Sequence, residues 1–190
     1  MIEKRGARLL TVAFLGLALA AGGCSKKEER PAGKPVEKAE DSKAFYSAVP
    51  FGGGEIVHEK VNVRGETVEM AHSKLDMGPP DNMFDNDLKT LVRTEKANPA
   101  VFDLDFPTPR AMKGVSVTTA FTEIGLTAKV TSAGSAGQKV YSKEFRSQSP
   151  DPTVGLDFDA GTGPVQKLRI EITKLDGTDG HIHIREIHFH

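Results

Sequence analysis

The sequence predicts an all-β fold, an antiparallel β-sandwich, and three observations support this prediction. Apolar and polar residues alternate with a period of two along several short segments of residues 45–190. Clusters of Gly, Pro, Ser and Asp separate these segments at intervals of roughly ten residues, which is the spacing of strands and turns in a sandwich. No stretch of residues 45–190 keeps the apolar spacing of a helix over about a dozen positions.

Each predicted strand places its apolar residues on the inward face and its polar residues toward solvent. The inward residues are Phe102, Leu104, Phe106, Val115, Val117, Leu126, Ala128, Val130, Val154, Leu156, Phe158, Leu168, Ile170 and Ile172. Asp103 and Asp105 have the opposite phase, so we expect them to be exposed solubility residues. Asp157 and Asp159 are expected to be exposed for the same reason, and Arg169 also falls in the outward phase.

The last ten residues, HIHIREIHFH, contain four of the six histidines and predict a final strand. Ile182 and Ile184 mark the inward face, which leaves His181 and His183 pointing outward. Two alternate histidines can supply two ligands to one zinc ion, but a zinc site needs at least a third ligand. The pattern therefore favours exposed strand residues, and transition-metal binding by His181 and His183 is the alternative.

The alternation changes phase after Glu186, because Ile187 and Phe189 are the next apolar residues. A β-bulge near Glu186 explains this change, since one extra residue exchanges the two faces of a strand. The bulge predicts that His188 and His190 also face away from the core.

The N-terminal region has the features of a secretion signal. Basic residues precede the apolar run at residues 9–21, which is shorter than the ~20 residues of a membrane-spanning helix. The run ends in AAGGCS, where Cys24 is the only cysteine of the chain. This segment resembles the bacterial lipobox. The resemblance implies that residues 1–23 are removed and that Cys24 is acylated and anchors the protein to a membrane. An ordinary secreted protein with an unrelated cysteine is the alternative.

The residues after the cysteine complete the predicted organisation. Ser25 and Lys26 are not the aspartate that retains lipoproteins at the inner membrane, so the same resemblance implies sorting to the outer membrane of the cell envelope. Residues 24–44 are charged and poor in apolar residues, which predicts a disordered tether. Residues 45–190 then form the β-sandwich domain, of a length that suits one core.

Within this domain, the segments VNVRGETVEM, NMFDNDLKTLVRT, AVFDLDFPTPRAMKGVSV and LRIEI…HIREIHF resemble the galactose-binding-like jelly roll of discoidin (F5/8 type C) domains. In that family an acidic loop and a glutamate of the last strand often hold a structural calcium ion. The resemblance implies calcium ligands at Asp85, Asp87, Thr90 and Glu186. Calcium prefers such hard oxygen ligands. The alternative is a turn rich in Asp and Asn whose side chains cap their own backbone.

Asn86 lies in this acidic loop at the position where the family commonly has glycine. Asparagine adopts left-handed backbone geometry more readily than most residues, so the loop conformation is expected to be kept. Val92 replaces a tryptophan of the family pattern, and the chain contains no tryptophan.

Function is predicted from the same resemblance, which implies a module that binds its ligand through loops at one end. The polar candidates for ligand contact are Arg93, Thr94, Glu95 and Asn98. A carbohydrate is the favoured partner. An envelope scaffold that binds another protein is the alternative, because sugar sites use exposed aromatic faces and the chain has only two tyrosines.

Two function classes are disfavoured by the sequence. Catalytic motifs such as Gly-x-Ser-x-Gly, a phosphate-binding glycine loop and His-Glu-x-x-His are absent, so we do not expect an enzyme. The formal net charge of −1 provides no basic surface for nucleic acid.

Overall fold

The computed structural model describes residues 54–176 and 180–190. The predicted signal peptide (1–23), the acylated Cys24 and the tether (24–44) lie outside the described residues, as does the start of the predicted domain. Within the described ranges, no helix is long and apolar enough to cross a bilayer.

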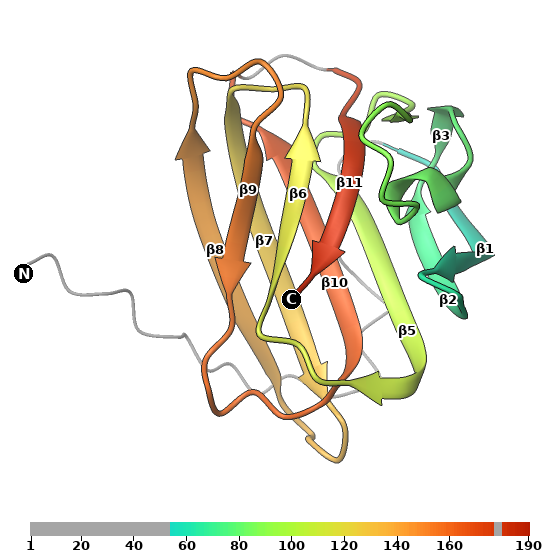
Figure 1. Cartoon of the computed structure of the whole chain (residues 1–190), viewed down its shortest axis with the longest axis vertical. Coiled ribbons are helices and arrows are strands. Elements are labelled where there is room, and N and C mark those ends of the chain that lie inside the picture. The colour runs from blue at the N-terminus through green and yellow to red at the C-terminus, as the bar shows by residue number, and fades with distance from the viewer. Residues whose placement is uncertain (1–53, 177–179) are drawn as a thin grey trace, which may run out of the picture. The chain divides into compact units, whose positions relative to one another are not determined.

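The described domain consists of two antiparallel sheets packed face to face (Figure 1), which confirms the predicted β-sandwich. One sheet has the strand order β1-β2-β5-β10-β7-β8 and the other β3-β4-β11-β6-β9. The elements are β1 (Ile56–Val63), β2 (Glu66–Ser73), β3 (Leu75–Met77), the 3-10 turn η2 (Pro80–Met83), β4 (Val92–Thr94), β5 (Ala100–Arg110), β6 (Gly114–Thr119), β7 (Glu123–Ser132), β8 (Gln138–Arg146), β9 (Thr153–Asp157), β10 (Val165–Lys174) and β11 (His183–Phe189).

The core lies between the two sheets and is built from the residues that the alternation assigns to the inward face. All of the predicted inward residues are buried, from Phe102 on β5 to Ile172 on β10. Removing this apolar surface from water contributes about 25 cal/mol for each Å² buried, so the period-two pattern itself selects the sandwich.

The outward face of the six-stranded sheet differs from the prediction. Asp103 is only 3% exposed and Arg169 only 5% exposed, so the expectation that they face solvent is wrong. The two residues are paired across β5 and β10, and their side chains form an ion pair with an N–O distance of 3.4 Å. Asp105 is half-buried, whereas Asp157 and Asp159 are exposed as predicted.

The predicted bulge in the last strand is present. The pairing of β11 with β6 shifts between Ile184 and Glu186, which leaves Arg185 as the extra residue. Ile184 and Ile187 are consequently both buried, and Glu186 also turns into the protein, where it is 6% exposed. The bulge therefore directs a carboxylate toward the loop that follows η2.

Candidate functional site

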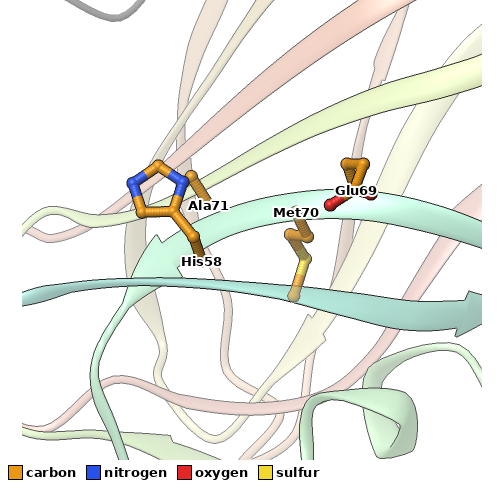
Figure 2. Close-up of a pocket in the computed structure, with 4 residues that line it drawn as sticks. All are labelled: His58, Glu69, Met70 and Ala71. Carbon is orange, nitrogen blue, oxygen red and sulfur yellow. The ribbon is translucent and has the colours of Figure 1, made fainter.

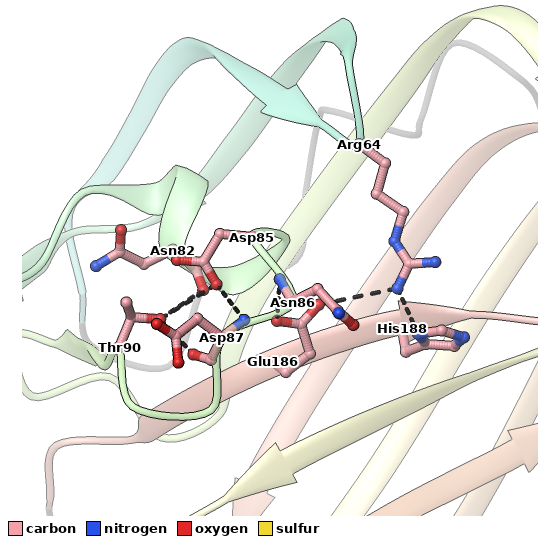
Figure 3. A network of polar contacts seen from close by, with 8 residues as sticks. All are labelled: Arg64, Asn82, Asp85, Asn86, Asp87, Thr90, Glu186 and His188. Atoms are coloured by element: carbon pink, nitrogen blue, oxygen red, sulfur yellow. Dashed lines mark hydrogen bonds and ion pairs between the residues drawn. The ribbon is translucent and has the colours of Figure 1, made fainter.

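The acidic loop between η2 and β4 is held by its own side chains (Figure 3). The Asp87 N–H donates to Asp85 Oδ1 at 2.8 Å, and the Lys89 N–H donates to Asp87 Oδ1 at 2.9 Å. The Thr90 hydroxyl donates to the Asp87 carbonyl at 2.7 Å. Asn86 has a φ of 61°, the left-handed geometry expected for it. These are the capping bonds of an Asx-rich turn.

Glu186 joins this loop to β11. Its Oε2 accepts a hydrogen bond of 3.0 Å from the Asn86 N–H, and Arg64 Nη2 lies 3.9 Å from its Oε1. Burial raises the pKa of the Glu186 carboxyl, and the Asn86 hydrogen bond opposes that rise. Arg64 comes from the β1–β2 turn and also contacts His188, so three separate segments meet at this point (Figure 3).

The fit of this loop to calcium rests on Glu186. Its Oε1 is buried and has no hydrogen-bond donor among the described residues, which suits a cation at this place. The acidic loop offers further hard oxygen ligands for calcium, namely the Thr90 hydroxyl and the backbone carbonyl groups of the loop. Within the described ranges no group of three or more His, Cys, Asp and Glu side chains is gathered around one point. Calcium binding by Asp85, Asp87, Thr90 and Glu186 stays a prediction.

The residues predicted to contact a ligand have structural contacts. Thr94 is fully buried, and its hydroxyl accepts a hydrogen bond of 2.9 Å from the Ile182 N–H. Asn98 bonds both backbone groups of Lys174, at 3.1 Å and 3.0 Å, and so fastens the β4–β5 loop to β10. Arg93 donates to both carboxylate oxygens of Asp76, at 2.7 and 2.9 Å, which lowers the pKa of that carboxyl. Ligand binding by these residues stays a prediction.

The two histidines proposed as metal ligands make different contacts. His181 Nδ1 lies 2.8 Å from the Thr94 carbonyl oxygen. The His183 ring stacks on Phe121, with ring centroids 5.7 Å apart. Burial lowers the pKa of His183, and the Arg93 guanidinium lowers it further. The structure places both histidines beside β4, and transition-metal binding by them stays a prediction.

A cleft lined by both polar and apolar side chains lies at one end of the sandwich, and no feature of the sequence predicted it. The loops β6–β7 and β8–β9 and the end of β10 meet at this end (Figure 1). The cleft has a volume of about 400 Å³, and its lining residues are Ala120, Phe121, Thr122, Glu123, Pro150, Lys174 and Asp176. Lys174 Nζ lies 5.3 Å from the centre of the Phe121 ring. These residues come from three separate parts of the chain, at 120–123, 150 and 174–176, and carry no shared motif, so no local signal marks the cleft.

Comparison with solved structures identifies the fold. The chain is similar to the CBM32 domain of AlyQ in complex with 4,5-unsaturated mannuronic acid (17% identity, 70% of this chain and 98% of that chain, TM-score 0.51). It is also similar to the F5/8 type C domain of a Bacteroides fragilis protein (16% identity, 70% and 95%, TM-score 0.52). A truncated AlyQ with CBM32 and alginate lyase domains matches with 17% identity and TM-score 0.51, but this chain covers only 34% of it.

These similarities show the fold: the two sheets of the described residues have the β-sandwich fold of the CBM32 and F5/8 type C domains that the chain resembles. The antiparallel β-sandwich expected from the strand spacing, and the discoidin-like fold that the resemblance implied, are thus confirmed. Comparisons with protein-family models and with curated proteins found no match.

Proposed function

We propose that this protein is a non-catalytic carbohydrate-binding module, anchored in the bacterial cell envelope by a lipid on Cys24. The observation that carries the proposal is the jelly-roll fold that the chain shares with the CBM32 domain of AlyQ, which was solved with a sugar acid. The acylated cysteine is supported by the lipobox-like sequence AAGGCS.

The cleft at the loop end supports this proposal as the place where a sugar binds. It combines hydrogen-bonding side chains with the partly exposed Phe121. Thr122 and Glu123 offer a hydroxyl and a carboxylate that can bond sugar hydroxyls. The cleft lies between loops, where jelly rolls can vary in sequence without loss of the core.

The charges around the cleft favour a neutral sugar over a uronic acid. Lys174 Nζ lies 3.0 Å from Asp176 Oδ2, and both residues line the cleft. Glu123 adds a further negative charge to the lining. A carboxylate on the ligand would meet Glu123 and Asp176 here, and the described lining cation, Lys174, is already paired with Asp176, so like-charge repulsion disfavours a uronic acid.

The test is a glycan array with the detergent-solubilised full chain, run once with calcium and once with EDTA. We expect binding to neutral glycans, weakened at least ~10-fold, about 1.4 kcal/mol, by Glu123→Gln. Glu69→Gln is the matched control, because Glu69 is exposed on β2 and does not line the cleft. No binding in either condition, by a chain whose circular dichroism shows the intact fold, overturns the proposal.

A protein-binding scaffold is the second candidate, and one observation favours it. No Phe or Tyr among the described residues is exposed as a stacking platform, whereas Met77 and Leu88 are 44% and 56% exposed. Exposed apolar side chains are typical of protein contacts. Two results together would favour this function. The chain binds no glycan on the array, and it forms a cross-link to an envelope protein that is lost in Leu88→Ser.

A further inference from the structure

The edge strand β8 carries a row of three cations, Lys139, Lys143 and Arg146, which we call the cationic row. None of them forms an ion pair with a carboxylate within residues 54–176 and 180–190. By contrast, every Lys and Arg on the other five strands of the same sheet is paired with an acid: Lys60, Arg110, Lys129, Lys167, Arg169 and Lys174. The cationic row is therefore an exception in this sheet, and its charges are available to a ligand.

The sequence around β8 concentrates positive charge. Residues 132–149 contain the three cations of the row and a single acid, Glu144, in a chain whose formal net charge is −1. Glu144 is exposed and lies opposite Gly125 of β7 in the strand register. The strand thus presents a local excess of positive charge to solvent, although the chain as a whole does not.

The cationic row borders the open edge of the sheet. Among the described strands, β8 pairs only with β7 and stands at the end of the strand order (Figure 1). Lys139 and Lys143 share one face of β8 and Arg146 belongs to the other, but long side chains on an edge strand can reach its open edge from either face. Lys143 and Arg146 are exposed, and Lys139 is half-buried. A strand of 9 residues spans roughly 30 Å, so the three charges form a line and not a single cluster.

The aromatic rings between these cations already have partners. Lys143 Nζ lies 5.0 Å from the centre of the Phe145 ring. The Tyr141 ring lies 4.9 Å from the Phe158 ring, and the Tyr141 and Thr162 hydroxyl groups are hydrogen-bonded at 2.7 Å. The row therefore offers a ligand positive charge and does not offer an open stacking surface.

The cationic row leads to the cleft at the loop end. Arg146 lies opposite Glu123 in the strand register, and Glu123 lines the cleft. Directly after Arg146, the Ser147 N–H donates a hydrogen bond of 2.8 Å to the carbonyl of Thr122, which also lines the cleft. The C-terminal end of β8 and the β6–β7 loop lie at the same end of the sandwich (Figure 1). A ligand in the form of a chain can therefore occupy the cleft with one end and lie along β8 with the rest.

The opposite edge of the same sheet has no such row. Its edge strand β1 contains one lysine, Lys60, which lies 3.3 Å from Glu69 of β2. Figure 2 shows a hollow of about 290 Å³ at this edge, and the described residues that line it are His58, Glu69, Met70 and Ala71. None of these four residues is a lysine or an arginine. The two edges therefore differ in charge, and β1 supplies a control position.

We propose that β8 binds an acidic polysaccharide, whose carboxylates pair with the cationic row while a neutral sugar of the same chain occupies the cleft. The inference rests on the proposed function for the class of ligand, and it adds a second contact surface of opposite charge preference. The cleft disfavours a carboxylate because it contains Glu123 and Asp176. The row favours one, because its cations have no acid of the described residues beside them.

Other anionic polymers fit the cationic row less well. Lysines on an edge strand discourage pairing with a further strand, which disfavours an extended acidic peptide. Single-stranded nucleic acid stacks its bases on exposed aromatic rings, and the rings of Tyr141 and Phe145 have contacts within the protein. A polysaccharide with repeated carboxylates needs neither strand pairing nor stacking.

Binding of polygalacturonate to the detergent-solubilised full chain tests this proposal. Every residue of this polymer carries a carboxylate, so it reports on β8 and not on the cleft, and its methyl ester is the neutral control. We expect Lys139→Gln, Lys143→Gln and Arg146→Gln combined to weaken binding at least ~10-fold, because three exposed ion pairs together account for about that factor. The control combines Lys60→Gln, Lys96→Gln and Lys113→Gln, which remove the same charge from exposed positions outside β8 and leave binding unchanged.

Three outcomes overturn the proposal. They are equal affinity for the polymer and its methyl ester, equal losses in the two triple variants, and equal affinity for oligothymidylate or phosphatidylglycerol vesicles. None of them affects the binding of neutral glycans, which Glu123→Gln tests, so the proposed function can hold where this inference fails. Conversely, polygalacturonate binding that only the β8 variant loses supports the inference even if the glycan array gives no signal.

Lysine acetylation of the parent protein covers the case in which the β8 variant does not fold. Mass spectrometry measures how fast each lysine reacts with and without polygalacturonate. We expect the bound polymer to slow the acetylation of Lys139 and Lys143 and to leave that of Lys60 and Lys113 unchanged. Equal protection of all four lysines, or of none, overturns the proposal.

Discussion

At the scale of single residues, Asp103 is the clearest case of a side chain governed by its surroundings. Burial raises its pKa to about 6, while the nearby Arg169 guanidinium lowers it and Glu171 raises it. An aspartate with a raised pKa holds its proton in the folded state over a pH range in which the unfolded chain releases it. Its ionisation therefore opposes folding as the pH rises from about 4 to about 6.

We predict that Asp103→Asn removes this pH dependence. Between pH 4 and pH 7 the free energy of unfolding of the variant should fall by about 2–3 kcal/mol less than that of the parent, since one pKa unit corresponds to about 1.4 kcal/mol. Denaturant unfolding of the parent and the variant at several pH values measures how each free energy of unfolding depends on pH. Asp105→Asn, on the same strand and face, should keep the parental decline. An unchanged decline in Asp103→Asn contradicts the prediction.

At the scale of the elements, Gly78 fixes how β3 leads into η2 and the acidic loop. Its φ is 75°, and a Cβ added there would lie 2.3 Å from the Leu91 carbonyl oxygen. Gly134, in the turn between β7 and β8, has a similar φ of 73°, but nothing lies within 4 Å of its added Cβ. The two glycines share a backbone conformation and differ in packing.

We predict that Gly78→Ala and Gly134→Ala separate these two effects. Both variants should lose about 1 kcal/mol because alanine is strained at a positive φ. Gly78→Ala should lose about 2 kcal/mol more, because backbone atoms must move to admit the methyl group. Urea unfolding of each variant measures the difference. If both variants lose the same free energy of unfolding, the β3–η2 segment accommodates the added methyl group without a further loss of stability. That result contradicts the prediction.

At the scale of the whole molecule, the acidic loop and Glu186 connect the β1–β2 hairpin with β11. A ligand that binds only the folded state stabilises it by mass action, by about 2.7 kcal/mol at a concentration ~100 times its Kd. We predict that calcium raises the Tm of the full chain by several degrees relative to EDTA and that Glu186→Gln abolishes this rise. Thr90→Val is a second variant, and Glu69→Gln is the control. An identical Tm with calcium and with EDTA would contradict calcium binding. The acidic loop would then be an Asx-rich turn whose side chains cap their own backbone.

The proposed membrane anchor gives a second prediction for the whole molecule. Cells fed an alkyne-labelled fatty acid should incorporate it into the parent protein, and the protein should sediment with membranes. Cys24→Ala, which removes the only cysteine, should abolish both the label and the sedimentation. A Cys24→Ala protein that still sediments with membranes would show that another part of the chain provides the attachment.

The sequence was sufficient for the features that depend on local alternation. A strand must bury one face, so every second residue of residues 102–106 or 168–172 is apolar, and this pattern defines the inward side. The same reasoning located the bulge before Glu186, because Ile187 breaks the phase. The conformation of Asn86 was also predictable, since it depends on one residue type.

Only the tertiary structure decided which polar side chains are buried or hydrogen-bonded within the fold and which are free to contact a ligand. Asp103 and Arg169 have the phase of exposed residues, yet both are buried, and they form an ion pair with each other across β5 and β10. Thr94 and Asn98 bond to Ile182 and Lys174, which are distant in sequence. The cleft at the loop end arises in the same way, because three connections meet only when both sheets are assembled. The alternation of apolar and polar residues is a property of each strand by itself. The burial of outward-facing residues and the position of a cleft depend on how the strands and loops pack together.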